Sequence, residues 1–378
     1  METKRIKIFV DAHSFDTEFQ GTQTFIEGLY TALMVHYPQL DIYFGAYDTE
    51  RVKKVFPLLD SSKILRYKKQ KPSAFRFLID IPQFIKKYAF DFAHFQYIIP
   101  FSNKHCKYIV TTHDVLFNDF PKEFSQLYRY KRNFLFKKSL QKAAIKTTVS
   151  AYSREKISSN YKMPEKHIHI IPNGMKVLPG NDLNKENARQ FIKEIYGIEN
   201  FILNVSRIEP RKNHLLLLNK FLELELYKQN ISLVFIGKQS IKVPELTEII
   251  SNLTAEQKRF FYWIEQVDTE ALLSFYQSCQ LFVYPSKAEG FGIPPLEAAL
   301  NLAPVLCSET TAMSDFNFFS PNTFNPENEN DFSAKLKNMI GHPPALCSLI
   351  KISEDISEKY SWHKSASLFY NLIKSWIQ

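Results

Sequence analysis

One short stretch of the chain combines an apolar run, a turn and the start of a helix. Residues 281–284 are typical of a buried strand end, and the prolines at 294–295 suit the first turn of a helix, where a missing N–H is no loss. We therefore expect a strand, a glycine turn and a helix N-terminus in succession. The residues that could do chemistry there are Glu289, Gly290, Phe291, Gly292, Ile293 and Glu297.

This arrangement predicts a binding site for an anion. A helix N-terminus presents backbone N–H groups and the positive end of a dipole, and the two glycines let the backbone approach a ligand closely. Two glutamates eight positions apart flank the same turn, and an ionised carboxylate only accepts hydrogen bonds, for example from hydroxyl groups. A ligand with both phosphates and hydroxyls is a nucleotide sugar. The alternative is that the glutamates are solvated and the glycines only turn the chain.

The stretch from Glu289 to Glu297 resembles the Glu-x7-Glu motif of retaining glycosyltransferases of the GT-B fold, in particular glycosyltransferase family four. The resemblance implies a catalytic position for Glu289 beside the donor sugar. It also implies that Glu297 holds the ribose and that the backbone amides of residues 290–293 face the diphosphate. We therefore expect these residues to lie together in one ligand site.

A second group of charged residues follows the strand expected at residues 201–206. Three cations, Arg207, Arg211 and Lys212, lie in the next few positions, and guanidinium and ammonium groups suit a diphosphate. The segment resembles the family's Gly-Arg…Lys-Asn signature, which implies that Arg207 and Lys212 clamp the donor's phosphates. Solvated surface charges are the alternative.

The first half of the chain offers His113 and Gly21. His113 and Asp114 end a strand expected at 108–112, and active sites of parallel sheets lie at such ends. We expect His113 to donate a hydrogen bond to a substrate hydroxyl, with Asp114 influencing its orientation, and the resemblance implies a catalytic position near the donor sugar. The alternative is that Asp114 caps a following turn and His113 is buried with its hydrogen bonds satisfied. Gly21 lies in a loop expected at 15–23, where it contacts the donor by resemblance or simply turns the chain.

The length of 378 residues predicts two domains, because one core rarely grows so large. The order of strands and helices predicts an α/β fold, and the resemblance implies the GT-B architecture, two Rossmann-like domains facing across a cleft. We expect an N-terminal acceptor-side domain at 1–180 and a nucleotide-sugar-binding domain at 181–360. A C-terminal helix at 361–378 is expected to cross back to the first domain.

The charge of the chain is unevenly distributed. Residues 1–180 hold 29 Lys and Arg against 16 Asp and Glu, and the rest is net acidic. The basic half predicts an anionic partner, either a membrane surface or nucleic acid. The helical stretch expected at 123–144 interleaves basic and aromatic residues but carries no nucleic-acid motif, so we favour lipid phosphates and expect no nucleic acid. The similar segment 73–88 is expected to pack on its own sheet, with a membrane interface as the alternative.

Other features indicate a cytoplasmic protein. No apolar run reaches the ~18 residues of a membrane span, and the four cysteines show no paired spacing. No convincing Asp-x-Asp motif occurs, so we expect no metal and no cofactor.

The expected activity is transfer of a hexose, possibly mannose, from a nucleotide sugar to a glycan or lipid-linked glycan, as in polysaccharide or O-antigen assembly. The resemblance implies retention of configuration. A nucleotide-sugar 2-epimerase of the same fold and a non-catalytic nucleotide-binding protein are the alternatives.

Overall fold

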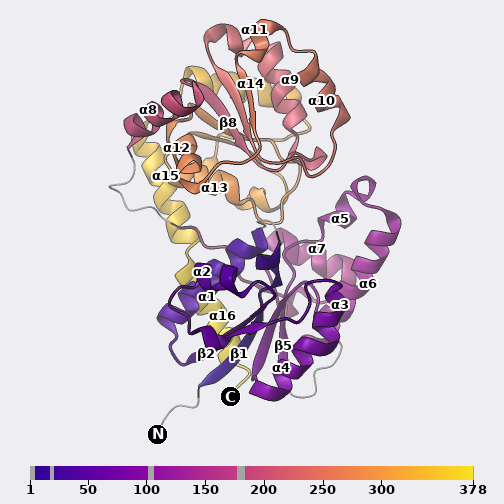
Figure 1. The fold of residues 1–378 in the computed structure, drawn as a ribbon. Coiled ribbons are helices and arrows are strands. Elements are labelled where there is room, and N and C mark those ends of the chain that lie inside the picture. The colour runs from indigo at the N-terminus through magenta and orange to yellow at the C-terminus, as the bar shows by residue number, and fades with distance from the viewer. Residues whose placement is uncertain (1–4, 18–20, 101–105, 177–183, 378) are drawn as a thin grey trace. The chain divides into compact units, whose positions relative to one another are not determined.

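The chain divides into two compact units, each a parallel sheet with helices packed on it (Figure 1). The computed structural model describes residues 5–17, 21–100, 106–176 and 184–377. The first unit contains Met1–Gly174 and Tyr360–Gln378, and the second contains Met175–Lys359. The expected domain boundary at residue 180 lies in 177–183, outside the described residues.

The first unit contains a seven-stranded sheet in the order β3-β2-β1-β4-β5-β6-β7. The chain proceeds outward from β1 in one direction and from β4 in the other, which is the doubly wound arrangement expected from the sequence. The strands are β1 (Ile6–Asp11), β2 (Leu40–Ala46), β3 (Ile64–Arg66), β4 (Phe92–Gln96), β5 (Lys107–Thr111), β6 (Ile145–Thr148) and β7 (His169–Ile170). The helices are α1 (Gly21–His36), α2 (Thr49–Val55), α3 (Ser73–Phe75), α4 (Ile81–Tyr88), α5 (Leu116–Asp119), α6 (Gln126–Lys142), α7 (Ala151–Tyr161) and α16 (Trp362–Lys374).

The second unit repeats this design with a six-stranded sheet in the order β10-β9-β8-β11-β12-β13. The order again reverses between β8 and β11, so ligands are expected beyond the carboxyl ends of these two strands. The strands are β8 (Phe201–Val205), β9 (Ser232–Ile236), β10 (Phe261–Ile264), β11 (Leu281–Tyr284), β12 (Val305–Ser308) and β13 (Thr323–Phe324). The helices are α8 (Lys185–Tyr196), α9 (His214–Glu223), α10 (Pro244–Ser251), α11 (Ala255–Lys258), α12 (Thr269–Ser278), α13 (Ile293–Leu300), α14 (Glu329–Gly341) and α15 (Leu346–Lys359).

The strand, turn and helix predicted around residue 290 are present in the second unit. All four residues of β11 are buried, and α13 begins at Ile293 with both prolines in its first turn. The turn therefore lies at the carboxyl end of one of the two strands that flank the reversal of strand order.

Two predictions in the first unit have different outcomes. The segment 73–88 packs on its own sheet, as favoured from the sequence, because Ile81 and Ile85 are buried in the core of the unit. The prediction of a loop at Gly21 is wrong, since α1 begins at this residue. The helix expected from Thr24 is present as the continuation of α1. Gly21 is thus the first residue of a helix.

The C-terminal helix α16 packs against α1 in the first unit, where two glycines admit the ring and backbone of Trp362. A Cβ atom on Gly28 would lie 1.9 Å from Trp362 Cε2, and one on Gly174 would lie 2.2 Å from the Trp362 nitrogen. Atoms do not approach so closely, so a larger residue forces Trp362 to move. Ser365 Oγ also donates a hydrogen bond to the Pro172 carbonyl at 2.7 Å.

Replacement of Gly28 tests this contact. We expect Gly28→Ala to lower the free energy of unfolding by about 1–3 kcal/mol, because the added methyl group overpacks the contact with Trp362. Gly341→Ala in α14 is the matched control, since a Cβ there meets nothing within 4 Å. Urea unfolding followed by near-ultraviolet circular dichroism measures both, and equal stabilities would contradict the assignment.

Candidate functional site

The carboxylate of Glu289 is the centre of a buried ion cluster in the second unit. Its side chain follows β11, and the residue is 7% exposed. Oε1 accepts hydrogen bonds from Lys212 Nζ at 2.6 Å, Ser286 Oγ at 2.6 Å and Tyr284 OH at 3.0 Å. Oε2 forms an ion pair with Arg211 Nη1 at 3.2 Å. The cluster therefore joins the turn after β11 to the turn after β8.

The cations keep this buried carboxyl ionised. Burial alone would raise the pKa of Glu289, but the charges of Lys212 and Arg211 outweigh burial and lower it from 4.5 to about 2. Burial also lowers the pKa of Lys212, and the Glu289 carboxylate opposes that shift. At neutral pH the site thus holds an anion whose charge is compensated by its neighbours.

The two oxygens of Glu289 differ in what they can still bind. Oε1 already accepts three hydrogen bonds, whereas Oε2 pairs with Arg211. A carboxylate offers about four lone-pair directions, so a further donor such as a sugar hydroxyl would be accepted at Oε2. Arg211 also donates to the Ala288 carbonyl and pairs with Glu209, which orients its guanidinium beside the turn.

A loop after β12 holds the backbone of the same turn. The Glu289 N–H donates to Thr311 Oγ1 at 2.9 Å, and Thr310 Oγ1 donates to the Lys287 carbonyl at 2.9 Å. Thr311 has φ of 56°, an unfavourable conformation for a β-branched residue. Such strain persists only where the surroundings impose it. The position of Glu289 is therefore fixed by both its side chain and its amide.

Gly292 makes the sharp turn into α13. Its φ is 98°, in the left-handed region that favours glycine. A Cβ atom would also lie 3.0 Å from Met313 and 3.1 Å from Phe316, so the position is tightly enclosed. Because Pro294 and Pro295 lack N–H groups, fewer amides need partners in the first turn of α13. The remaining donors in that turn suit an anion.

Glu297 lies on α13, the helix that follows the turn. It is half-buried and accepts a hydrogen bond from Tyr276 OH at 3.0 Å through Oε2. Burial raises its pKa, and the Tyr276 hydrogen bond opposes this rise. The geometry leaves Oε1 of Glu297 as the oxygen for a further donor.

The structure separates the two cations that the sequence favoured. Lys212 contacts Glu289 directly, whereas Arg207 is exposed in the turn after β8. Arg211, which the sequence grouped with the other two as a cation suited to a diphosphate, also contacts Glu289. The phosphate-binding role of Arg207 stays a prediction. The signal for Arg211 was its position one residue before Lys212 in a run of three cations. Ser286, Tyr284 and Thr311 had no comparable sequence signal.

His113 belongs to the first unit, at the carboxyl end of β5. Its ring is 8% exposed, packs against Phe25 at 5.0 Å, and donates from Nε2 to Gln96 Oε1 at 2.8 Å. Burial lowers the pKa of His113 to about 4, so the ring is neutral at pH 7. A neutral ring that donates from Nε2 accepts at Nδ1. In this tautomer His113 has Nδ1 as its acceptor, while its donating nitrogen is engaged by Gln96. The expected donation to a substrate hydroxyl stays a prediction.

Asp114 caps the turn that follows it. Its Oδ1 accepts the Leu116 N–H at 3.2 Å and so begins the turn of α5. Gln96, on the neighbouring strand β4, holds the His113 ring. Gly21 lies in the same unit, at the first position of α1, and a Cβ there would meet nothing within 4 Å. The sequence-predicted residues are thus divided between the two units.

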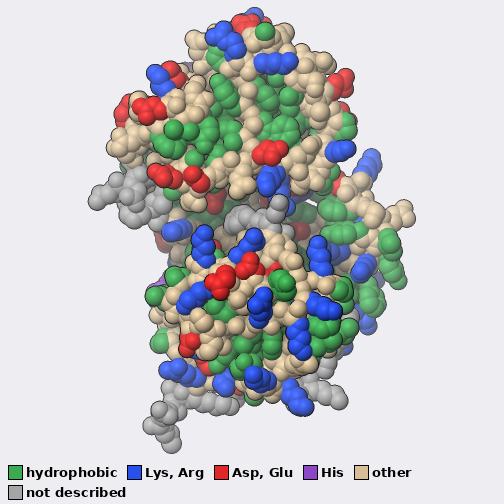
Figure 2. Space-filling view, in the orientation of Figure 1, with side chains coloured by type: hydrophobic (Ala, Val, Ile, Leu, Met, Phe, Trp, Pro, Cys, Tyr) green, Lys and Arg blue, Asp and Glu red, His purple; other side chains and the backbone are tan. Residues whose placement is uncertain are grey.

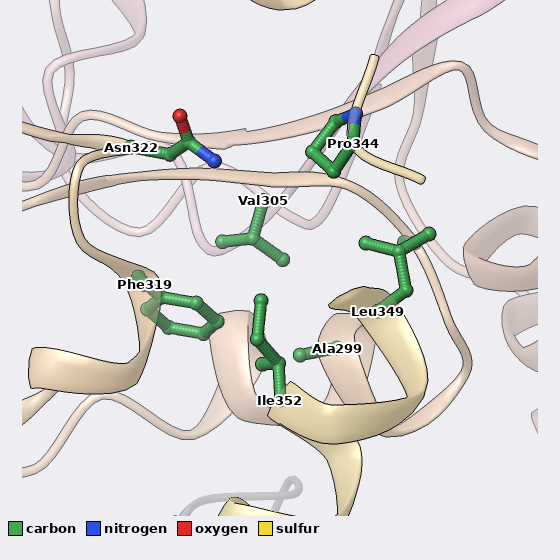
Figure 3. Close-up of a pocket in the computed structure, with 8 residues that line it drawn as sticks. Ala299, Val305, Phe319, Asn322, Pro344, Leu349 and Ile352 are labelled. Atoms are coloured by element: carbon green, nitrogen blue, oxygen red, sulfur yellow. The ribbon is translucent and has the colours of Figure 1, made fainter. Parts of the chain in front are cut away.

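Two cavities of different kinds lie in the described parts of the chain. The cavity in Figure 3 lies behind α13, where Ala299, Val305 and Leu349 point toward one another, and its volume is about 10 Å³. That volume is no larger than one water needs, so this cavity is a packing defect and not a ligand site. A cavity of 380 Å³ in the first unit is lined by Asp16, Tyr47, Asp48, Thr49, Glu50, Arg51, Arg66 and Gln70.

The described part of the chain holds neither a group of metal ligands nor a membrane-spanning helix. Within those residues, no three His, Cys, Asp or Glu side chains are grouped as metal ligands would be. Within the same part of the chain, no helix combines the length and apolar character needed to traverse a bilayer.

Both halves of the chain match models of glycosyltransferase families. The model "Glycosyltransferase Family 4" matches residues 19–177, and the model "Glycosyl transferases group 1" matches residues 185–349. The two doubly wound units and these two matches are those of the GT-B fold of glycosyltransferases. The chain belongs to the family-four type of these enzymes.

Similar proteins include mannosyltransferases. The O-antigen chain mannosyltransferase RfbU of Salmonella typhimurium is 26% identical over 63% of this chain and 62% of its own length. The serotype-specific mannosyltransferase WbdA of Escherichia coli is 32% identical over 32% of this chain and 15% of its own. The chain thus covers less than two thirds of the length of these relatives.

Solved structures share the fold over nearly the whole chain. Sucrose-phosphate synthase from Thermosynechococcus elongatus superposes with a TM-score of 0.75 at 16% identity, covering 99% of both chains. Anabaena HepE in complex with UDP-glucose gives 0.72 at 14% identity, covering 98% of this chain and all of that one. At such identities the likeness concerns the fold alone.

The ion cluster predicts a stability that depends on pH. The folded pKa of Glu289 is below its ordinary value of 4.5, so the stabilisation is complete above pH 4.5 and is lost as the pH falls toward 2. We expect Glu289→Gln to be less stable than the wild type by about 3 kcal/mol at neutral pH, with a deficit that shrinks below pH 4.5. Urea unfolding at a series of pH values measures this, and a deficit independent of pH would argue against the cluster.

The hydroxyl of Thr311 gives a second prediction. Thr311→Val keeps the branched shape but leaves the Glu289 N–H without its acceptor, so we expect a loss of about 1–3 kcal/mol in the free energy of unfolding. Thr311→Ser keeps the hydroxyl and is expected to stay near the wild type. Thermal unfolding of the two variants compares them directly, and a valine variant as stable as the serine variant would exclude this role.

Proposed function

We propose that the protein is a retaining, metal-independent glycosyltransferase that moves mannose from a nucleotide sugar to a glycan or lipid-linked glycan. The observation that carries this proposal is the cluster of Glu289, Lys212 and Arg211 beside the glycine turn and the N-terminus of α13. Cations and backbone amides suit a diphosphate there, and carboxylate oxygens suit hydroxyl groups.

In the proposed complex the donor lies on the second unit. Lys212, Arg207 and the amides of residues 290–293 bind the diphosphate, and Glu297 accepts hydrogen bonds from the ribose. Glu289 accepts hydrogen bonds from the hexose at Oε2, the oxygen that pairs with Arg211. Arg211 keeps that oxygen charged and oriented.

The proposed reaction depends on stabilising the leaving diphosphate. Negative charge develops on the diphosphate as the glycosidic bond breaks, and fixed cations and amides stabilise it without reorganising. These groups supply the positive charge that a metal would otherwise provide. The leaving phosphate then takes the proton of the acceptor hydroxyl on the same face of the sugar, so the configuration is retained.

The choice of mannose rests on the relatives. RfbU and WbdA are named mannosyltransferases, and RfbU acts on an O-antigen chain by its name. We propose GDP-mannose as the donor, with a UDP-hexose as the alternative, since HepE was solved with UDP-glucose. We propose a role in the assembly of a cell-surface polysaccharide, in the cytoplasm and at the membrane.

The first unit is the proposed location of the acceptor. Its 380 Å³ cavity presents carboxylates, an amide, a phenol and guanidinium groups, which are the usual partners of sugar hydroxyls. Neutral His113, with Nδ1 as an acceptor, is proposed to bind a hydroxyl of the transferred sugar.

A panel of nucleotide sugars tests the proposal. We expect GDP-mannose to raise the melting temperature more than the corresponding UDP-hexoses, because a ligand that binds only the folded state stabilises it. Transfer of labelled mannose to lipid-linked glycan should continue in the presence of a chelator. A donor that is converted to an epimer without an acceptor would instead indicate the epimerase alternative.

Variants of the cluster test the site. We expect Glu289→Gln and Lys212→Gln to reduce kcat/KM for transfer by roughly 100-fold or more, because each removes charge next to the reacting centre. Each also leaves a buried partner unpaired, so assays belong well below the measured melting temperature. Glu245→Gln and Lys242→Gln, at exposed positions of the same unit, are the controls. Wild-type turnover in both cluster variants would refute the site.

A further inference from the structure

The outer face of α6 is basic and apolar at once. Helical spacing brings Leu127, Tyr130, Lys131, Phe134 and Lys138 to one side of the helix, at intervals of three and four residues. Leu127 is 77% exposed, Tyr130 75% and Phe134 51%, and both lysines are exposed. On the face drawn in Figure 2, apolar and basic side chains lie side by side where Figure 1 draws α6.

The opposite face of α6 packs on the core of the first unit. Phe136, Ser139 and Leu140 are buried, and Ser139 Oγ accepts the Ile99 N–H at 3.1 Å. The helix therefore does not need Leu127 and Tyr130 to attach to its sheet. Exposed apolar residues grouped on one face are typical of an interaction surface.

The charge of α6 selects the kind of partner. The helix has no Asp or Glu, and four lysines border the apolar residues: Lys131, Lys137, Lys138 and Lys142. Lys138 Nζ also lies 5.9 Å from the centre of the Phe134 ring. Lysine side chains can extend their ammonium groups to phosphates while their stems lie along apolar surface. Aromatic rings and leucine insert at the level of lipid headgroups.

We propose that this outer face of α6 docks the protein on an anionic membrane. The helix would lie in the plane of the interface, with Leu127, Tyr130 and Phe134 among the headgroups and the lysines on lipid phosphates. This inference deepens the proposed function, on which it rests for a lipid-linked acceptor, by naming the surface that meets the membrane.

Vesicle co-sedimentation of the full chain tests the docking surface. We expect the wild type to bind vesicles containing about one third phosphatidylglycerol and to bind phosphatidylcholine vesicles weakly, with binding that falls as salt is added. We expect Lys131→Gln/Lys137→Gln/Lys138→Gln and Leu127→Ser/Tyr130→Ser/Phe134→Ser each to weaken anionic binding at least about tenfold. All six positions are exposed, so both variants should fold.

Matched controls separate this face from charge and apolarity in general. Lys242→Gln/Lys258→Gln/Lys337→Gln removes the same charge from exposed positions of the second unit. Leu58→Ser/Ile195→Ser/Leu346→Ser removes exposed apolar residues elsewhere. We expect both controls to bind anionic vesicles as the wild type does. Control variants that lose as much binding as the α6 variants would overturn the proposal.

Other outcomes also decide it. Equal wild-type binding to both kinds of vesicle would overturn the docking proposal. So would an α6 apolar variant that binds vesicles normally but loses self-association in analytical ultracentrifugation, since the face would then cover a second copy. The thermal shift with a nucleotide sugar is measured on the same variants and does not involve lipid. Donor binding without membrane binding would thus reject the surface alone, and the reverse would reject the proposed activity alone.

Discussion

The buried charge of Glu289 is the constraint on which the arrangement of the second unit depends. A carboxylate removed from water destabilises the fold unless cations and hydrogen-bond donors compensate it. Here Lys212 and Arg211 come from the turn after β8, and Ser286 and Tyr284 come from the end of β11. Satisfying one anion therefore fixes two neighbouring turns at the point where the strand order reverses.

The same compensation determines how the site can act on a ligand. Lys212 is partly neutralised by Glu289, so its charge is shared between a protein anion and any bound phosphate. In the proposed reaction, the negative charge that develops on the leaving diphosphate would be stabilised by these cations without movement of the backbone. A site built on a preformed ion cluster is rigid, and the strained Thr311 increases this rigidity by holding the Glu289 amide.

The sequence predicted the features that local signals determine. Glycine and proline defined the turn and the start of α13, and the alternation of strands and helices defined two doubly wound sheets. The partners that come from distant segments could not be predicted in this way. Thr311 meets Glu289 from 22 residues away, and Gln96 reaches His113 from a neighbouring strand. The pairing of Arg211 with Glu289 could not be predicted either, because side-chain direction in the short 3-10 turn Pro210–Lys212 follows from backbone geometry.

The first unit is discontinuous, since Trp362 fills space left by Gly28 and Gly174. During synthesis the ribosome releases the N-terminal segment long before the residues that complete it. The nascent first unit therefore lacks its contact with Trp362 until the entire second unit has been synthesised. The second unit has no such delay, because Met175–Lys359 is one uninterrupted segment. The order of maturation is thus opposite to the order of translation: the part made later can finish folding first.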